Sequence, residues 1–138
     1  MRVVIDTNVL VSSLRSRRGA SFRLLQELGS SEFDPVISPP LCLEYEAVLR
    51  RPGLLPGFTM QDIDDFLDYF LSECIECQIH FLWRPHLPDP QDDLVLELAL
   101  AGGAPFIVTH NLRHFAGVND FGIRPVTPDE FLRILFPK

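Results

Sequence analysis

Two hydrophobic patterns alternate along the chain: short runs of consecutive β-branched residues, and longer segments whose apolar residues recur at helical spacing. The run Val3-Val4-Ile5 is typical of a strand that is buried on both faces. Further strands are expected at residues 33–38, 78–82 and 105–109 and around Val126. Helices are expected over residues 20–28, 39–51, 59–77, 90–101 and 129–136. Strands that alternate with helices in this way predict a parallel α/β sheet within one domain, residues 1–138.

The composition fits a folded domain that works inside the cell. Of the 138 residues, 46% are hydrophobic, which is too large a share for a disordered chain. No apolar run reaches the ~20 residues that span a bilayer, and the N-terminus lacks the pattern of a secretory signal, so we expect a cytoplasmic protein that does not bind membranes. Cys74 and Cys77 form a C-x-x-C pair near the end of a predicted helix. Without a second pair or a helix N-terminus, reduced thiols are a simpler interpretation than a zinc or redox site.

The charge of the chain at first argues against a nucleic-acid partner. The formal net charge is −7, but many of the acids fall within residues 62–76, a pattern typical of a solvated helix face. Three arginines, Arg15, Arg17 and Arg18, follow the first strand in a segment that we expect to be a loop. These arginines could bind RNA phosphates with bidentate hydrogen bonds, or could simply keep an exposed loop soluble.

Acidic residues recur at positions where sheets of this kind bind ligands. Asp6 ends the first strand, and parallel α/β sheets bind ligands beyond the carboxyl ends of their strands. Glu44 interrupts the apolar stripe of its predicted helix, where a carboxylate is unfavourable unless it is paired or binds a metal. Asp92 and Asp93 open a helix that is apolar nearly all round, and Asp93 is the less easily explained by the helix dipole. Together these acids suggest a divalent-metal site.

The predicted strand at residues 105–109 is also followed by polar groups. Thr109 ends this strand, and Asn111 offers a neutral oxygen to a hard cation or a hydrogen bond to bound water. His110 and His114 are more often structural or solvent-facing than ligands of magnesium, which prefers oxygen. Asn111 is therefore the candidate ligand of this segment.

Taken in order, these motifs resemble the PIN-domain ribonucleases, and in particular their toxin-like group, which includes the VapC toxins. The resemblance covers essentially the whole chain and is carried by residues 6–12, 38–45, 89–101 and 109–115. It implies a three-layer α/β/α fold around a central, mostly parallel sheet of four to five strands. It also implies an endoribonuclease that uses one or two Mg²⁺ or Mn²⁺ ions to cleave single-stranded RNA, as the toxin of a toxin–antitoxin pair.

The resemblance also implies roles for individual residues. The acids of the family correspond to Asp6, Glu44 and Asp93 as catalytic metal ligands, and Asp92 is a neighbour that can share the role. Members of the family often carry a fourth acid in the segment where this chain has Asn111, which leaves open how a second metal would be held. Hydrogen bonds that orient the carboxylates are expected from Thr7, Asn8, Ser38 and Thr109.

Two other classes of Asp-centred α/β protein are excluded by single residues. A haloacid-dehalogenase-like phosphatase needs a second Asp where this chain has Asn8, and a response-regulator receiver needs a late-strand lysine, whereas the only lysine is Lys138. A catalytically weak PIN fold that binds RNA or a protein stays open as the alternative. The apolar residues of the helix over residues 59–77, such as Phe66 and Phe70, either cover the sheet or form a contact between copies, and we predict a homodimer through this helix.

Overall fold

The computed structural model describes residues 1–79 and 87–137, and among them five strands form one parallel sheet. The strands are β1 (Arg2–Ile5), β2 (Asp34–Ile37), β3 (Ile75–Glu76), β4 (Phe106–Val108) and β5 (Arg124–Val126). Their order is β3-β2-β1-β4-β5, and each neighbouring pair is parallel. Val3, Val4 and Ile5 of the central strand are fully buried, as a strand covered on both faces requires.

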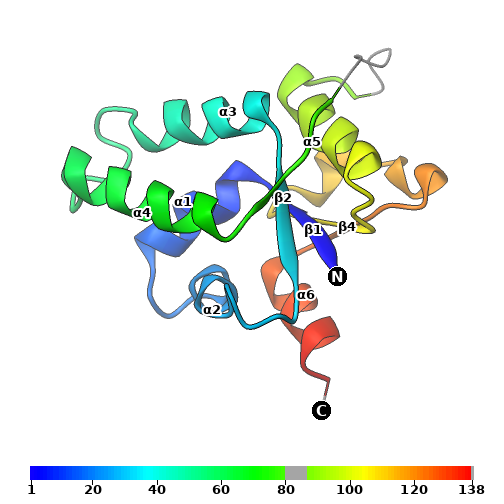
Figure 1. The fold of residues 1–138 in the computed structure, drawn as a ribbon, viewed down its shortest axis with the longest axis horizontal. Coiled ribbons are helices and arrows are strands. Elements are labelled where there is room, and N and C mark those ends of the chain that lie inside the picture. The colour runs from blue at the N-terminus through cyan, green and yellow to red at the C-terminus, as the bar shows by residue number, and fades with distance from the viewer. Residues whose placement is uncertain (80–86, 138) are drawn as a thin grey trace.

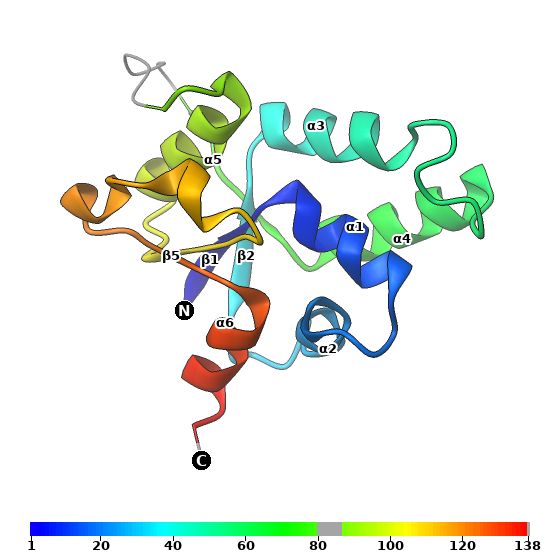
Figure 2. The same cartoon turned by 180° about the vertical axis from the view of Figure 1, so that it is seen from behind.

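Helices cover both faces of this sheet. The α-helices of the described residues are α1 (Thr7–Arg15), α2 (Ala20–Gln26), α3 (Pro39–Leu49), α4 (Met60–Ser72), α5 (Pro90–Ala101) and α6 (Pro128–Leu135), and the 3-10 helices are η1 (Leu112–Phe115) and η2 (Val118–Phe121). Figures 1 and 2 show α5 on one side of the sheet and α1, α2 and α4 on the other. Helix α5 packs against β1, β2 and β4, whereas α2 packs against α1 and α6. The predicted three-layer α/β/α arrangement around a parallel sheet is confirmed.

The sequence did not predict the helix between the first strand and the arginine-rich loop, where Thr7–Arg15 form α1; of the expected loop, Arg15 is helical and residues 16–19 are not. The Asp6 carboxylate begins this helix by accepting the backbone N–H of Thr7 at 2.9 Å. Val9 and Leu10 are fully buried, so packing against the core outweighs the modest helix propensity of a β-branched residue.

The third strand lies earlier in the chain than expected. The helix predicted over residues 59–77 ends at Ser72, and β3 is Ile75–Glu76 instead of residues 78–82, of which 80–82 lie outside the described residues. The backbone N–H of Cys77 donates to the carbonyl oxygen of Ile37 at 2.7 Å, which continues the pairing of β3 with β2. The chain therefore leaves the helix soon enough to add a short edge strand.

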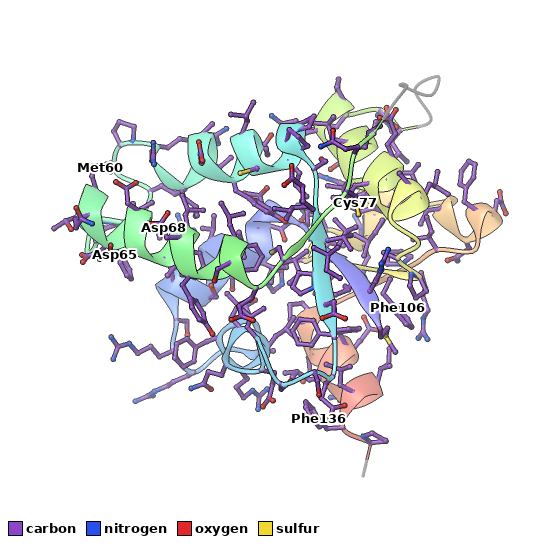
Figure 3. All side chains as sticks on the ribbon, in the orientation of Figure 1. Met60, Asp65, Asp68, Cys77, Phe106 and Phe136 are labelled. Atoms are coloured by element: carbon purple, nitrogen blue, oxygen red, sulfur yellow. The ribbon has the colours of Figure 1, made fainter. Side chains whose placement is uncertain are left out.

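Helix α4 covers the core with one face and carries acids on the other. Thr59 and Asp62 form a capping box that fixes its first turn. The side chains that α4 buries are Ile63, Leu67 and Phe70. Asp65 and Asp68 are exposed, and Figure 3 shows them on this outlying helix. The acids of α4 thus lie on a solvated helix face, as predicted, whereas Glu73 caps the end of the helix and Glu76 lies in β3.

The cysteines and glycines add little chemistry to this frame. Cys42, Cys74 and Cys77 are free, half-buried thiols. A Cβ added to Gly102, which follows α5, would lie 3.0 Å from the carbonyl oxygen of Leu98 and 3.2 Å from the sulfur of Cys77, so this close approach requires glycine. None of the helices in the described residues is both long and apolar enough to cross a bilayer.

Candidate functional site

The carboxyl ends of β1 and β4 lie side by side at the centre of the sheet. The strand order reverses between them, and parallel α/β sheets bind ligands at such a point. The backbone N–H of Asp6 donates to the carbonyl oxygen of Val108 at 2.9 Å, which sets the two strand ends level. The hydroxyl of Thr109 then donates to Asp6 Oδ2 at 2.8 Å, although the two residues are 103 positions apart.

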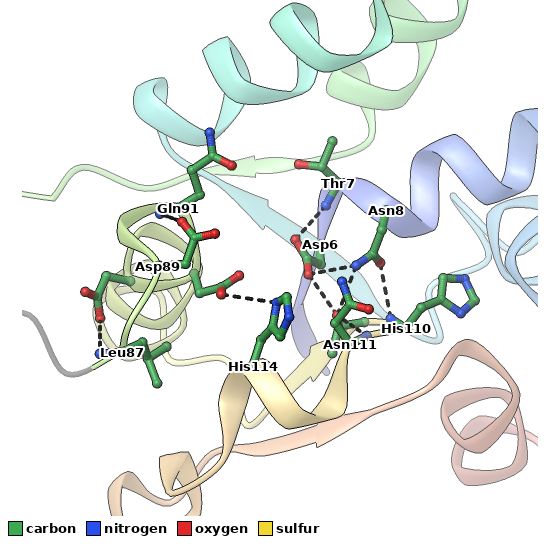
Figure 4. A network of polar contacts seen from close by, with 12 residues as sticks. Asp6, Thr7, Asn8, Leu87, Asp89, Gln91, His110, Asn111 and His114 are labelled. Atoms are coloured by element: carbon green, nitrogen blue, oxygen red, sulfur yellow. Dashed lines mark hydrogen bonds and ion pairs between the residues drawn. The ribbon is translucent and has the colours of Figure 1, made fainter. Parts of the chain in front are cut away.

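Asp6 is held in place by a small network of hydrogen bonds, drawn in Figure 4. Its Oδ1 accepts the backbone N–H of Thr7 at 2.9 Å, and its Oδ2 accepts both the Thr109 hydroxyl and the side-chain amide of Asn8, the latter at 3.2 Å. The Asn8 carbonyl oxygen accepts the backbone N–H of His110 at 3.2 Å. Thr7, Asn8 and Thr109 therefore surround Asp6 and fix the direction in which it points.

Burial makes the Asp6 carboxylate difficult to ionise. The residue is only 9% exposed, and its removal from water raises the pKa of its carboxyl. The hydrogen bonds from Thr109, Thr7 and Asn8 and the nearby imidazole of His114 act in the opposite direction but do not outweigh burial. A positive charge bound next to Asp6 would favour its ionised form.

Asp6 borders a cleft of about 490 Å³ that is lined by four segments of the chain. The end of β1 and helix α1 contribute Asp6, Thr7, Asn8, Val11, Ser12, Arg15 and Ser16. Helix α3 and the turn after it contribute Leu41, Glu44, Val48, Arg51 and Leu54. The start of α5 contributes Asp89, Gln91, Asp92 and Val95, and the segment after β4 contributes Asn111 and His114. Carboxyl groups that are far apart in sequence therefore share one cleft.

Glu44 reaches this cleft because α3 is anchored at its first turns. The hydroxyl of Ser38 caps the helix by accepting the backbone N–H of Leu41 at 3.3 Å, so Ser38 positions α3 and does not itself line the cleft. The fully buried Tyr45 donates its hydroxyl to the carbonyl oxygen of Ile5, the residue before Asp6. This bond ties the helix that carries Glu44 to the strand that carries Asp6.

Burial and nearby acids raise the pKa of two further carboxyl groups of the cleft, those of Glu44 and Asp92. For Glu44, burial is the main cause of a raised pKa; the charge of Arg51 opposes it, and the charges of Asp6 and Asp89 add to it. For Asp92, burial again comes first and repulsion from Asp6 second, and together they raise the pKa to about 6. The cleft therefore concentrates negative charge that the fold does not neutralise.

At the start of α5, the structure turns Asp92 and not Asp93 into the cleft. Asp89 caps the helix by accepting the backbone N–H of Gln91 at 2.9 Å. Asp93 Oδ1 instead accepts the backbone N–H of Leu87 at 3.0 Å, and Asp93 does not line the cleft. The sequence pattern favoured Asp93 as the ligand, whereas in the structure Asp92 is the one of the two that lines the cleft.

The arginines at the cleft differ from those expected. Of the three predicted to meet phosphates, Arg15 lines the cleft, whereas Arg17 and Arg18 are exposed outside it. Arg51 lines the cleft as well and was not predicted. The spacing that marks Glu44 could have found Arg51, since it lies seven residues, or about two helical turns, further along the same stripe.

The segment after β4 places Asn111 and His114 at the cleft and turns His110 away from it. The backbone N–H of Asn111 donates to the hydroxyl of Thr109 at 3.0 Å, and His114 Nδ1 lies 3.3 Å from Asp92 Oδ2. His110 Nε2 is 2.9 Å from the hydroxyl of the buried Ser21 in α2, and burial lowers the pKa of this imidazole. His110 thus connects two elements, in line with its expected structural role.

Oxygen atoms dominate the acidic part of the cleft, and oxygen donors are what Mg²⁺ and Mn²⁺ prefer. Across residues 1–79 and 87–137, no three His, Cys, Asp or Glu side chains lie close enough together to hold a metal ion. The acids of the cleft therefore have the right chemistry for a hard cation, and their side chains would have to move closer to coordinate one.

Comparisons with known proteins agree with this geometry. The family model for the PIN domain matches residues 2–113. Among solved structures, the chain resembles the crystal structure of VapBC2 from Rickettsia felis bound to a DNA fragment from their promoter, with a TM-score of 0.65 and 16% identity over 92% of this chain and 98% of that chain. A search of the curated proteins found no match. Since the family match covers most of the chain and includes the acids of the cleft, this protein belongs to the PIN-domain family.

Proposed function

We propose that this protein is a cytoplasmic, metal-dependent endoribonuclease that hydrolyses phosphodiester bonds in single-stranded RNA and is the toxin of a toxin–antitoxin pair. The observation that carries the proposal is that Asp6, Glu44 and Asp92, from three separate elements, line one cleft. Burial raises the pKa of all three carboxyls, and the charge of Asp6 raises the pKa of Glu44 and Asp92 further. Destabilising charge gathered in a cleft is typical of a functional site.

Asp6, Glu44 and Asp92 are the residues that would hold one or two Mg²⁺ or Mn²⁺ ions, and Asn111 borders the same cleft as a neutral donor. When bound, such an ion offsets the charge of the phosphate and lowers the pKa of an attached water molecule. We choose Asp92 as the third carboxylate in place of Asp93, because Asp93 is engaged by a backbone N–H outside the cleft.

Neighbouring residues hold two of these carboxylates, those of Asp6 and Asp92, in fixed orientations. Thr7, Asn8 and Thr109 all donate hydrogen bonds to Asp6, which restrains its rotation and supports its ionised form. His114 Nδ1 lies against Asp92 Oδ2 and restrains that carboxylate in the same way. Two of the three acids are thus oriented by neighbours before any ligand arrives.

Cleavage of a single-stranded RNA in Mg²⁺ or Mn²⁺, compared with cleavage in a chelator, tests the proposal. Asp6→Asn, Glu44→Gln and Asp92→Asn are each expected to lower the rate by orders of magnitude while circular dichroism shows an intact fold. Asp93→Asn is the matched control, because it makes the same chemical change one residue further along α5. Cleavage that survives the chelator, or equal rates for Asp92→Asn and Asp93→Asn, would contradict the assignment.

A catalytically weak module that binds RNA or protein is the second candidate. Asn111 stands where members of the family often carry an acid, and in the described residues no three ligands are already assembled. A neutral amide holds a hard cation less strongly than a carboxylate does. Binding of RNA without metal-dependent cleavage would favour this alternative.

We further propose two protein partners, an antitoxin and a second copy of the chain. The similar Rickettsia structure is that of VapBC2 bound to a promoter DNA fragment, which supports a protein partner of that kind. For the second copy, Phe70 is fully buried in its own core, but Tyr69 is 50% exposed. Phe66 and Tyr69 border an apolar hollow of about 290 Å³ between α1, α2 and α4, and this surface would form the contact.

A further inference from the structure

The cleft of the proposed active site has two long walls, formed by α1 and α3. Both helices begin above the strand ends and run away from the sheet in the same direction, as Figures 1 and 2 show. The lining residues of α1 include Asn8, Val11 and Arg15, which recur every three or four positions on one face of the helix. Glu44 and Val48 form the equivalent stripe on α3. Two stripes along neighbouring helices make the cleft a groove that extends away from the acids.

The two ends of this groove carry opposite charge. Asp6 precedes α1 and Glu44 lies at the middle of α3, whereas Arg15 ends α1 and Arg51 follows α3. Arg15 is nine residues after Asp6, and Arg51 is seven residues after Glu44, so at 1.5 Å per helical residue their backbones are roughly 10–14 Å apart along the helices. In the described residues no ion pair joins either arginine to these acids, although the charge of Arg51 does lower the pKa of Glu44.

Arg15 and Arg51 are the arginines that line the cleft, and neither has an acidic partner among the described residues. In the part of the chain that the structure describes, Arg23, Arg50 and Arg133 each pair with an aspartate, and Arg15 and Arg51 pair with none. Arg15 donates only to the carbonyl oxygen of Leu54, at 3.3 Å, which leaves most of its five N–H donors for a ligand. Two unpaired guanidinium groups at one end of a groove are suited to an anion, and phosphate fits their geometry best.

The stretch between the two ends is apolar. Val11 on α1 and Val48 on α3 line it, with Ser12 next to Val11, and Leu54 lines the same cleft and accepts a hydrogen bond from Arg15. The order along the groove is therefore acidic, apolar and basic. In a single nucleic-acid strand the bases branch from the sugar–phosphate backbone, so a strand with one phosphate at the acids and another at the arginines can turn a base toward the apolar stretch between them.

We propose that a single RNA strand lies lengthwise in this groove, with the reacting phosphate at Asp6, a base against Val11 and Val48, and a second backbone phosphate bound by Arg15 and Arg51. This inference rests on the proposed function, since it takes RNA as the substrate and the acids as the reacting end. It adds a phosphate site remote from the reacting bond, and that site sets how the strand is placed.

The salt dependence of RNA binding tests this placement. A fluorescein-labelled, mixed-sequence single-stranded RNA would be titrated in chelator, where binding is measured without metal-dependent cleavage. Each phosphate contact in a single strand contributes about 0.7 to the slope of log K against log salt concentration. Arg15→Gln and Arg51→Gln are each expected to weaken binding about tenfold and to reduce the slope by about that amount. Arg51→Lys keeps the charge and should restore the slope.

Arg50→Gln is the matched control, because Arg50 adjoins Arg51 but pairs with Asp64 on the outer surface. It should leave both the affinity and the slope unchanged, and Val48→Ser should weaken binding with an unchanged slope. If Arg15→Gln and Arg51→Gln behave like Arg50→Gln while the wild type cleaves RNA, the placement is wrong and the proposed function stands. If the slopes change as expected but no metal-dependent cleavage occurs, the placement stands and the proposed function is wrong.

Discussion

Asp92→Asn is expected to stabilise the metal-free protein above about pH 6. Burial, reinforced by repulsion from Asp6, Asp89 and Asp93 and opposed by His114, raises the pKa of the Asp92 carboxyl from 3.8 to about 6. At about 1.4 kcal/mol per pKa unit, this corresponds to at most about 3 kcal/mol, and solvent screening in an open cleft reduces it to about 1–2 kcal/mol. Because the pKa is higher in the folded state, the folded protein loses this stability as the pH rises from about 4 to about 6.

Urea titration in chelator, repeated between about pH 4 and about pH 8, measures the free energy of unfolding that this prediction concerns. The stability difference between Asp92→Asn and wild type should be near zero at the acidic end and should reach its full value above about pH 6. Asp93→Asn should gain no stability, because Asp93 accepts the backbone N–H of Leu87. Mg²⁺ should then stabilise wild type more than Asp92→Asn. Equal stability of wild type and Asp92→Asn at the basic end would refute the reasoning.

Three further measurements bear on the same fold and site. Asn111→Asp should lower the metal concentration for half-maximal RNA cleavage, because a charged oxygen binds a hard cation more strongly; an unchanged dependence would make Asn111 structural. Tyr45→Phe should lower the free energy of unfolding by about 1–3 kcal/mol in urea titration, because it leaves the buried carbonyl oxygen of Ile5 without its donor, whereas Tyr69→Phe at an exposed site should not. Light scattering should show a dimer that Tyr69→Asp dissociates, and a monomeric wild type would exclude this contact.

Most of the fold could be predicted from the sequence, because buried strands and one-sided helices leave clear periodicities. One exception is the position of β3, and another is α1, where Val9 and Val11 flank Leu10 in a run that resembles a strand by residue type. Only the tertiary structure shows that Asp6 caps a helix there, since its carboxylate could equally have been a free ligand at a strand end. Asp6 both caps α1 and lines the cleft, and the sequence alone does not show which of these two roles its carboxylate has.

A site residue could be predicted from the sequence only where the pattern of its own strand or helix marks it. Asp6 could be predicted because it comes directly after a buried strand, and Glu44 because it is an acid on the apolar stripe of a helix. The choice between Asp92 and Asp93 depends on a rotation of about 100° around α5, and on the backbone N–H of Leu87 that engages one of them. No local propensity encodes that contact, because it forms only when the preceding segment has folded against the helix.

The separation of charges in this fold explains how a chain with net charge −7 can be suited to an anionic substrate. Part of the negative charge lies on α4, where Asp65 and Asp68 face solvent and no residue of that helix lines the cleft. Exposed charges at such distances are largely screened at physiological salt. Within the groove, a bound cation would neutralise the acids, and Arg15 and Arg51 add positive charge at the other end. The local charge of the groove, and not the sum over the chain, therefore decides whether RNA is attracted to it.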